Sequence, residues 1–412
     1  MGRLVPLALH RRQRIPRVGV EQTGERLSTP MASNRYGPWA PTTRHEVFAA
    51  LDGCAAPWWF AGGHALELFT GRTWRAHDDI DIGIRRIDAP AVLDHLRRRG
   101  WEPVVAAAGV LSPWDGGPLD AATHQNNVWC RRPGGPWQLD VIVGEGDDGR
   151  WVYRRDPAIT RPWSEAVLER DGVRFLAPEL QLLFKSKDVR GKDTVDVEQV
   201  APLLDGGGLA LLAAQLRGDH PWLAMLRGLA PACTADDVLV VLDVLARAGL
   251  RAWVDGGWAV DALLRQQTRT HADLDLAVER ASFEPALDAL DQHGFRIVRD
   301  DGRHNRVVAD RVGRMVDLHA FDPTVVSIDD DGVARHGGDG LGYERGGFDG
   351  RGTIGGREVA SISPATLVRY HTGYDVDDDD WHDVRLLCGR FDLPVPPDYD
   401  RFTSLTRRPV RG

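Results

Sequence analysis

Two short acidic stretches of the chain have the residue types and the spacing of a metal site. Both contain Arg-x-His-x-Asp-x-Asp: RAHDDIDI at residues 75–82 and RTHADLDL at residues 269–276. In an extended strand, residues two apart point to the same face. Asp79 and Asp81 would then share one face, as would Asp273 and Asp275, and paired carboxylates repel each other unless a cation lies between them. Because Mg²⁺ binds one or two protein carboxylates together with phosphate and water oxygens, the spacing predicts two Mg²⁺ sites, and a solvated strand edge is the alternative.

A pair of glycines precedes each acidic stretch. Gly62-Gly63 and Gly256-Gly257 stand between a short apolar run, typical of a strand, and a segment with helical periodicity. A Gly-Gly turn at the start of a helix exposes backbone N–H groups near the positive end of the helix dipole, where phosphate groups bind. These four glycines are therefore predicted to offer a site for phosphate groups, and an ordinary tight turn is the alternative.

A single aspartate lies in a later apolar run of each half: Asp140 in WQLDVIV and Asp317 in RMVDLHAF. An unpaired buried charge is costly, and a nearby metal ion removes that cost. Two-metal phosphoryl-transfer sites use a third carboxylate to share a metal ion and to deprotonate the acceptor. Asp140 and Asp317 are therefore predicted to be both metal ligands and catalytic bases, and an ordinary strand-edge aspartate is the alternative.

These residues belong to an internal repeat. Residues 57–86 align with residues 251–280 at a constant offset of 194 without a gap, so that the glycine pair, the arginine, the histidine and both aspartates coincide. Each half is predicted to be an α+β domain, with a small mixed twisted sheet flanked by helices and a helical C-terminal tail. Three segments are expected: a disordered N-terminal extension at 1–42, copy one at 43–228 and copy two at 229–412.

The composition argues against several classes of protein. The formal net charge of −9 argues against a nucleic-acid partner, since nucleic-acid-binding proteins usually carry a basic stripe. No apolar run approaches the roughly 20 residues that a membrane span requires. The four cysteines are far apart and lack zinc-site spacing, which favours a cytoplasmic protein with free thiols.

Both copies resemble antibiotic nucleotidyltransferases of the DNA polymerase β-type superfamily. In copy two, GGWAVDALLRQQTRTHADLDL (256–276), VDLHAF (316–321) and the tail at 363–399 are similar to the aminoglycoside 2''-adenylyltransferase and lincosamide nucleotidyltransferase families. In copy one, WWFAGGHALELFTGRTWRAHDDIDIGI (58–84) and later segments up to HPWL (220–223) resemble the aminoglycoside-2''-adenylyltransferase-like group. The resemblance implies two tandem nucleotidyltransferase-fold domains.

The resemblance also assigns roles. It implies that the glycine pairs hold the nucleotide phosphates and that the Asp-x-Asp pairs bind Mg²⁺. The third aspartate would bind metal or act as base while a substrate hydroxyl attacks the α-phosphate. Four cations could contact the phosphates: Arg75, Arg269, Lys185 and Lys187. For the arginines an ion pair within the protein is the alternative, and His77 and His271 are expected to orient the site, since Mg²⁺ prefers oxygen ligands.

The predicted function is Mg²⁺-dependent transfer of a nucleoside monophosphate, with AMP from ATP expected, to a hydroxyl of an antibiotic-like small molecule. An acceptor of aminoglycoside or lincosamide type would make the protein an antibiotic-resistance enzyme. Two alternatives remain: a toxin-like nucleotidyltransferase acting on tRNA or protein, and a tandem nucleotide- or drug-binding protein with one vestigial site. Because related enzymes build the acceptor pocket between two subunits, the copies are also candidates for a pseudo-dimer within one chain.

Overall fold

Each repeat begins with the strand–glycine–helix unit that the sequence predicts. β1 (Trp58–Phe60) leads into α2 (Gly62–Thr70), and β11 (Trp253–Asp255) leads into α10 (Gly256–Leu264). The strands are short, apolar and buried, and the apolar residues of both helices pack into the core. Local sequence therefore determines these two units.

The computed structural model describes residues 36–323, 326–328, 334–336, 343–344 and 346–406. Residues 1–35 of the predicted N-terminal extension lie outside the described residues. Two residues assigned to that extension pair with the first sheet: the N–H of Ala40 donates to the carbonyl of Trp137 at 2.9 Å, and the N–H of Thr42 donates to that of Gln138 at 3.1 Å. Backbone pairing with the sheet thus begins before residue 43.

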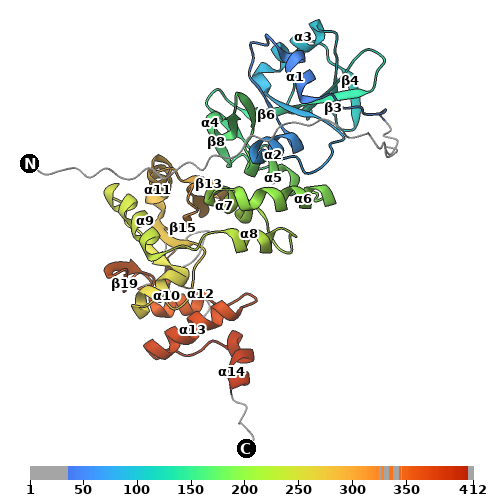
Figure 1. The fold of residues 1–412 in the computed structure, drawn as a ribbon. Coiled ribbons are helices and arrows are strands. Elements are labelled where there is room, and N and C mark those ends of the chain that lie inside the picture. The colour runs from blue at the N-terminus through green and yellow to red at the C-terminus, as the bar shows by residue number, and fades with distance from the viewer. Residues whose placement is uncertain (1–35, 324–325, 329–333, 337–342, 345, 407–412) are drawn as a thin grey trace, which may run out of the picture. The chain divides into compact units, whose positions relative to one another are not determined.

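The first sheet has ten strands, all within copy one (Figure 1, blue to green). Eight of them follow the order β4-β3-β5-β6-β2-β1-β10-β9, and β7 and β8 are attached at β6. The bounds besides β1 are β2 (Asp81–Arg85), β3 (Glu102–Ala107), β4 (Val110–Pro113), β5 (Asn127–Arg131), β6 (Trp137–Gly146), β7 (Arg150–Val152), β8 (Thr160–Pro162), β9 (Val167–Arg170) and β10 (Val173–Leu176).

The second sheet has seven strands, all within copy two, in the order β13-β14-β15-β12-β11-β20-β19. A separate small sheet consists of β16, β17 and β18. The bounds besides β11 are β12 (Leu274–Glu279), β13 (Arg296–Asp300), β14 (Asn305–Ala309), β15 (Met315–Phe321), β16 (Val326–Ile328), β17 (Ala334–His336), β18 (Tyr343–Glu344), β19 (Gly350–Ile354) and β20 (Arg357–Ser361).

The second sheet repeats the order of seven strands of the first, β3-β5-β6-β2-β1-β10-β9. The strand directions also agree: β2 runs parallel to β6 and antiparallel to β1, and β12 runs parallel to β15 and antiparallel to β11. In both sheets the short strand before the glycines is parallel to a late strand, β10 or β20. The α+β class, the mixed sheets and the tandem duplication are therefore confirmed.

Helices pack against both sheets, and a helical tail follows each of them (Figure 1). Local capping contributes, since Thr43, Thr234, Ser363 and Asp377 each accept a backbone hydrogen bond as N-cap residues. The remaining helices are α1 (Arg44–Leu51), α3 (Ala89–Arg98), α4 (Trp163–Ala166), α5 (Pro178–Lys185), α6 (Gly191–Val200), α7 (Gly206–Gln215), α8 (Leu223–Leu229), α9 (Ala235–Arg247), α11 (Arg280–Gln292), α12 (Pro364–Tyr370), α13 (Asp378–Phe391) and α14 (Asp400–Thr406), with 3₁₀ turns at Arg86–Asp88, Ala201–Leu203 and Pro397–Tyr399.

The buried apolar side chains form two clusters, one in each half. The copy-one cluster also contains Val298, Val307 and Ala309 from strands β13 and β14 of copy two. The side-chain amide of Gln215, at the end of α7, donates to the carbonyl of Val298 at 2.7 Å. The exact boundary between the copies at residue 229 stays a prediction.

Candidate active site

Three carboxylates come together in each half. Parallel pairing of β2 with β6 sets Asp81 directly beside Asp140, and parallel pairing of β12 with β15 sets Asp275 beside Asp317. Because these residues are partners in register, their side chains project from the same face of the sheet. The first aspartate of each pair joins them from the loop before the strand.

The position of that first aspartate differs from the expectation of a shared strand. β2 begins at Asp81 and β12 begins at Leu274, so Asp79 and Asp273 both precede the strands. The reason is that β1 and β11 have only three residues and turn directly into their helices, which leaves no neighbouring strand on that side for the earlier residues. Asp79 and Asp273 are therefore held by their loops and not by the sheet.

Burial and mutual repulsion perturb the carboxylates. Burial, followed by the charges of Asp79 and Asp140, raises the pKa of Asp81 well above its usual range. Burial raises the pKa of Asp140 to about 7. Burial together with the charges of the other two carboxylates raises the pKa of Asp273 to about 7 in copy two. Each cluster thus favours the binding of protons or of a cation.

The copy-one residues fit Mg²⁺. Among the described residues no lysine or arginine forms an ion pair with Asp79 or Asp81 within 4 Å, whereas the neighbouring Asp78 pairs with Lys192 at 3.7 Å. The amide of Asn127 donates to both oxygens of Asp140 at 3.1 Å and so fixes the orientation of this carboxylate. A set of oxygen ligands with uncompensated negative charge is what Mg²⁺ requires.

Copy two has the corresponding three carboxylates, but more side-chain nitrogen atoms lie close to them than in copy one. The amide of Asn305 donates to Asp317 at 2.5 Å, and Nη2 of Arg299 donates to the other oxygen of Asp317 at 3.1 Å. Nε2 of His319 lies 3.5 Å from Oδ1 of Asp275 and 3.7 Å from Oδ1 of Asp317. The carboxylates, led by Asp275, outweigh burial and raise the pKa of His319 to about 9.

The first glycine of each pair allows the carboxylate to approach the helix start. Gly62 and Gly256 have φ of +62° and +56°, and a Cβ at either position would overlap the side chain of Asp81 or Asp275. The N–H of Gly62 donates to Gln181 at 2.7 Å, and the N–H of Gly256 donates to the adjacent Asp255 at 2.8 Å. These two N–H groups are therefore not bare, contrary to the expectation from the sequence.

The second glycine lies against the arginine and the histidine of the motif. A Cβ on Gly63 would overlap His77 and Arg75, and a Cβ on Gly257 would overlap His271 and Arg269. This packing explains why glycine pairs and Arg-x-His occur together in both copies. A contact of Gly63 or Gly257 with phosphate stays a prediction.

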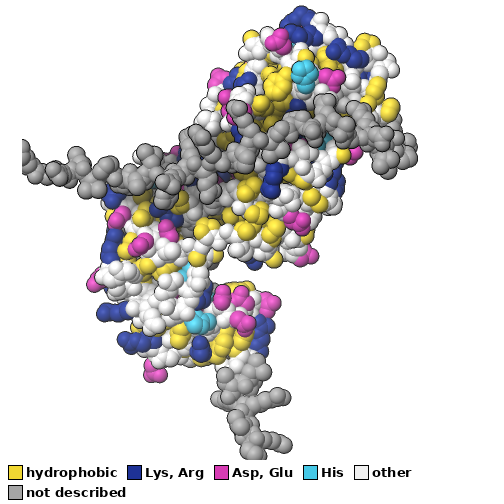
Figure 2. Space-filling model, viewed as in Figure 1, with side chains coloured by type: hydrophobic (Ala, Val, Ile, Leu, Met, Phe, Trp, Pro, Cys, Tyr) yellow, Lys and Arg dark blue, Asp and Glu magenta, His cyan; other side chains and the backbone are white. Residues whose placement is uncertain are grey.

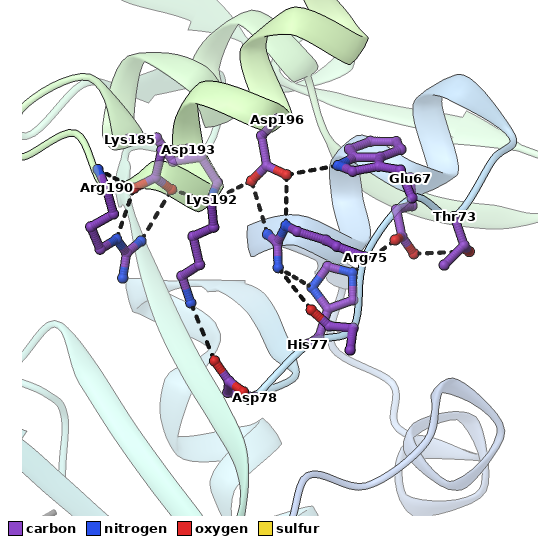
Figure 3. A network of polar contacts seen from close by, with 12 residues as sticks. Glu67, Thr73, Arg75, His77, Asp78, Lys185, Arg190, Lys192, Asp193 and Asp196 are labelled. Atoms are coloured by element: carbon purple, nitrogen blue, oxygen red, sulfur yellow. Dashed lines mark hydrogen bonds and ion pairs between the residues drawn. The ribbon is translucent and has the colours of Figure 1, made fainter. Parts of the chain in front are cut away.

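Arg75 forms a buried ion pair (Figure 3). Its Nε and Nη2 atoms donate to the two oxygens of Asp196 in α6 at 2.7 and 2.8 Å, and the Asp196 side chain is fully buried. Trp74 Nε1 and Lys185 Nζ each lie 3.0 Å from the same carboxylate. Arg269 repeats this contact with the buried Asp383 of α13, at 2.7 Å from Nη2. Both arginines thus tie the acidic loop to the helical tail.

The histidines complete this network. Nε2 of His77 donates to Glu67 of α2 at 2.9 Å, which leaves Nδ1 to accept from Arg75 at 3.0 Å. In copy two, His271 contacts Asp261 of α10 at 2.5 Å. The Arg-x-His half of each motif therefore positions the loop that carries the carboxylates. An orienting role is what the sequence predicted for the histidines, and phosphate binding by the arginines stays a prediction.

The two predicted lysines have different surroundings. Lys185 is nearly buried, with Nζ 2.8 Å from Asp193 and 3.0 Å from Asp196, whereas Lys187 is exposed. Asp196 and Asp383 were not found from the sequence, because they lie 187 residues apart and an ungapped comparison at an offset of 194 does not align them.

A cavity of about 130 Å³ lies beside the strands β2 and β6 that carry Asp81 and Asp140. Gly83 and Ile142, each two residues after a carboxylate, line it together with Trp59 and Gln181. In the described part of the chain, Nη1 of Arg154 at its wall is buried without a hydrogen-bond partner. The sequence offered no signal for this cavity, since its walls come from separate elements.

A Gly-Gly helix start beside two carboxylates on adjacent parallel strands, with a third in the loop before the first of these strands, is the arrangement expected of a nucleotidyltransferase. The chain belongs to the aminoglycoside-2''-adenylyltransferase family, whose profile matches residues 44–108 and 237–387, slightly more than half of the chain. The match to copy one ends before Asp140, whereas the match to copy two includes all three carboxylates.

Individual relatives include a lincosamide resistance protein and an aminoglycoside nucleotidyltransferase. A lincosamide resistance protein from Staphylococcus haemolyticus is 24% identical over 157 residues, which are 37% of this chain and 94% of that protein. A 2''-aminoglycoside nucleotidyltransferase from Escherichia coli is 39% identical over 64 residues, which are 15% of this chain and 36% of that protein.

Two solved structures are also similar. The lincomycin-bound lincosamide adenylyltransferase LnuA is 22% identical, with a TM-score of 0.33, and the match covers 40% of this chain and 100% of that chain. ANT(2'')-Ia in complex with adenylyl-2''-tobramycin is 20% identical, with a TM-score of 0.32, and the match covers 42% of this chain and 99% of that chain. Within the described residues, no helix is both long enough and apolar enough to span a membrane.

Proposed function

We propose that the protein is a Mg²⁺-dependent adenylyltransferase that moves AMP from ATP to a hydroxyl of an antibiotic of aminoglycoside or lincosamide type and thereby confers resistance. The observation that carries this proposal is the pairing in register of Asp81 with Asp140 and of Asp275 with Asp317 beside the glycine pairs. Pure nucleotide binding would not require a base, so the presence of a third carboxylate in both copies favours transfer.

The residues have the following proposed roles. Asp79, Asp81, Asp273 and Asp275 would bind the metal ion, together with one oxygen of the third carboxylate. Mg²⁺ would supply positive charge to the phosphate oxygens and to the attacking hydroxyl. Asp140 would take the proton of the acceptor hydroxyl, which its pKa of about 7 suits at neutral pH, and Asp317 would do so in copy two.

The phosphates would lie at the starts of α2 and α10. The helix dipole and the backbone N–H groups of the first turn favour an anion there, and we propose that the N–H groups of Gly63 and Gly257 donate to it. Gly62 and Gly256 would adjoin the phosphates, with their own N–H groups donating to Gln181 and Asp255. Arg75, Arg269 and Lys185 are held in ion pairs, so we assign them a long-range electrostatic contribution to nucleotide binding. Lys187 is the exposed cation that could contact phosphate directly.

A nucleic-acid acceptor is less well supported. The net charge is −9, and on the face drawn in Figure 2 acidic side chains stand among the basic ones. An RNA-binding surface usually gathers lysine and arginine in a patch or a stripe. A small-molecule acceptor therefore fits the charge of this protein better than tRNA does.

We further propose that the copies pack as a pseudo-dimer within the chain. Arg296 of copy two forms an ion pair with Glu165 of copy one at 3.0 Å, and residues of β13 and β14 join the copy-one core.

We also propose that the protein is located in the cytoplasm, which is supported by four free cysteines, three of them buried.

A substrate panel tests the proposal. The purified full chain would be incubated with aminoglycosides and lincosamides and with ATP, GTP, CTP or UTP, and the products would be measured by mass spectrometry. The expected result is an acceptor that gains the mass of AMP in the presence of ATP and Mg²⁺. If no acceptor gains the mass of any nucleoside monophosphate, the proposed reaction is wrong.

Paired variants assign the reaction to a copy. Asp79→Asn/Asp81→Asn disables copy one, and Asp273→Asn/Asp275→Asn disables copy two. Loss of a metal ligand costs several kcal/mol of barrier, so the active copy should lose at least about 100-fold in rate. Because the family profile spans the whole of the copy-two site, we expect the larger loss there.

A further inference from the structure

Copy one and copy two differ at one position that faces the metal site. In the first sheet Asn127 pairs in register with Ile142, and in the second sheet Asn305 pairs in register with His319. Ile142 and His319 each lie two residues after the third carboxylate, so both project from the face that carries the carboxylates. The same place in the fold therefore offers a hydrocarbon in one copy and an imidazole in the other.

The imidazole of His319 points at the carboxylates. Its Nε2 lies 3.5 Å from Oδ1 of Asp275 and 3.7 Å from Oδ1 of Asp317, and the side chain is 19% exposed. Two ligand atoms that are each roughly 2.1 Å from one ion lie about 3.0 to 3.6 Å apart for angles from about 90° to 120°. One oxygen of each carboxylate and Nε2 can therefore share an ion after a shift of a few tenths of an ångström.

The surroundings of the site allow this set of ligands. Arg299 binds Oδ2 of Asp317, and Oδ1 accepts a hydrogen bond from Nδ2 of Asn305 at 2.5 Å and keeps its second lone pair for an ion. Among the described residues, Oδ1 of Asn305 is buried without a partner, while its Nδ2 lies 2.9 Å from Nδ1 of His319. A half-turn of this amide would give up its hydrogen bond to Oδ1 of Asp317, which the ion would then bind instead, and would give the Nδ1–H of a metal-bound His319 an oxygen acceptor, the usual support of a histidine ligand.

We propose that His319 is a metal ligand and that the copy-two site is therefore a mixed oxygen–nitrogen site for a divalent transition ion such as Mn²⁺, whereas copy one is an oxygen site for Mg²⁺. This inference rests on the proposed function, because it assumes that the carboxylates bind a divalent ion. Imidazole nitrogen suits transition ions, whereas carboxylate and water oxygen suit Mg²⁺. The two copies would then differ in metal preference within one chain.

Pulsed electron paramagnetic resonance of bound Mn²⁺ tests the proposal directly, since it detects a coordinated ¹⁴N nucleus without any turnover. The full chain carrying Asp79→Asn/Asp81→Asn restricts Mn²⁺ to copy two and should show one imidazole ¹⁴N coupling. Adding His319→Ile, the residue type that copy one has at this place, should remove the coupling. Loss of an outer-shell partner already costs 10- to 100-fold, so Mn²⁺ affinity should fall by at least about tenfold.

The reverse construction provides a matched gain of function. The full chain carrying Asp273→Asn/Asp275→Asn restricts Mn²⁺ to copy one and should show no ¹⁴N coupling, and Ile142→His should create it. Circular dichroism melting of each variant shows whether it is folded. Mn²⁺ bound in copy two without ¹⁴N coupling, or a coupling that survives His319→Ile, would overturn the inference and leave the proposed function intact. If neither Mn²⁺ nor Mg²⁺ binds to either copy of the folded wild-type chain, the proposed function fails as well.

Discussion

Replacing Asp196 by asparagine should destabilise the protein strongly, although the residue lies outside the carboxylate cluster. The Asp196 side chain is fully buried and accepts hydrogen bonds from Arg75 at 2.7 and 2.8 Å and from Trp74 at 3.0 Å, and Lys185 lies 3.0 Å away. Asparagine keeps the size but removes the charge and turns an NH₂ group toward these donors. Arg75 then stays in its place without an anion.

The magnitude follows from this burial. Removing one partner of a buried ion pair costs about 3–5 kcal/mol. Lys185 retains its second partner, Asp193, at 2.8 Å, so we expect the lower end, about 3 kcal/mol. At roughly 2–4 °C per kcal/mol for a domain of about 200 residues, the melting temperature of copy one should fall by about 6–12 °C. Mg²⁺ affinity should fall too, because Arg75 holds the loop that carries Asp79.

Urea denaturation and calorimetry measure the stability, and isothermal titration measures Mg²⁺ binding. Asp94→Asn is the matched control, since Asp94 pairs with Arg97 on the exposed face of α3 and such pairs are worth at most about 1 kcal/mol. A loss below about 1 kcal/mol for Asp196→Asn, together with unchanged Mg²⁺ binding, would refute the view that this buried pair positions the loop.

Three further outcomes are expected. EDTA should abolish nucleotide transfer and excess Mg²⁺ should restore it, and full turnover in metal-free protein would contradict the mechanism. The pKa of Asp140 and that of Asp273 are about 7, above the ordinary value of an aspartate. The protonated forms of these residues therefore contribute folding stability that is fully present below about pH 4 and is lost as the pH rises through 7. The rise in melting temperature caused by Mg²⁺ should therefore be larger at pH 8 than at pH 6, and an equal rise at both would show that these carboxylates do not bind the ion. Gly63→Ala should lower stability and activity, because its Cβ would overlap His77. Gly389→Ala in α13 should leave both unchanged or raise stability slightly, because a Cβ added there would meet no atom of another element within 4 Å.

The local units were predictable from the residues alone. An apolar run that ends at Gly62-Gly63, followed by helical periodicity, could form only a strand and a helix with a tight turn between them, and the same holds for Gly256-Gly257. The unpaired charge of Asp140 within an apolar strand pointed to a neighbouring cation for the same local reason. The ungapped repeat then predicted two copies of one fold, and the matching strand order confirms it.

Other features depended on contacts between distant parts of the chain. The parallel register that sets Asp81 beside Asp140 joins strands separated by more than 50 residues, and Arg75 meets Asp196 across 121 residues. Sequence spacing suggested that Asp79 lies on the strand and that the N–H of Gly62 is bare, but the short β1 and the side chain of Gln181 decided otherwise.

The sequence by itself thus predicted which residues would carry the chemistry, and it determined that this set of residues occurs twice and which local elements surround it. This was possible because hydrophobic periodicity and glycine conformation act over a few neighbouring residues. Only the tertiary structure decided that both arginines are held by buried carboxylates, and that an isoleucine faces the aspartates in copy one where a histidine faces them in copy two. Those outcomes depend on strand register and on helix packing, in which the partners of a side chain come from elements far apart in the chain.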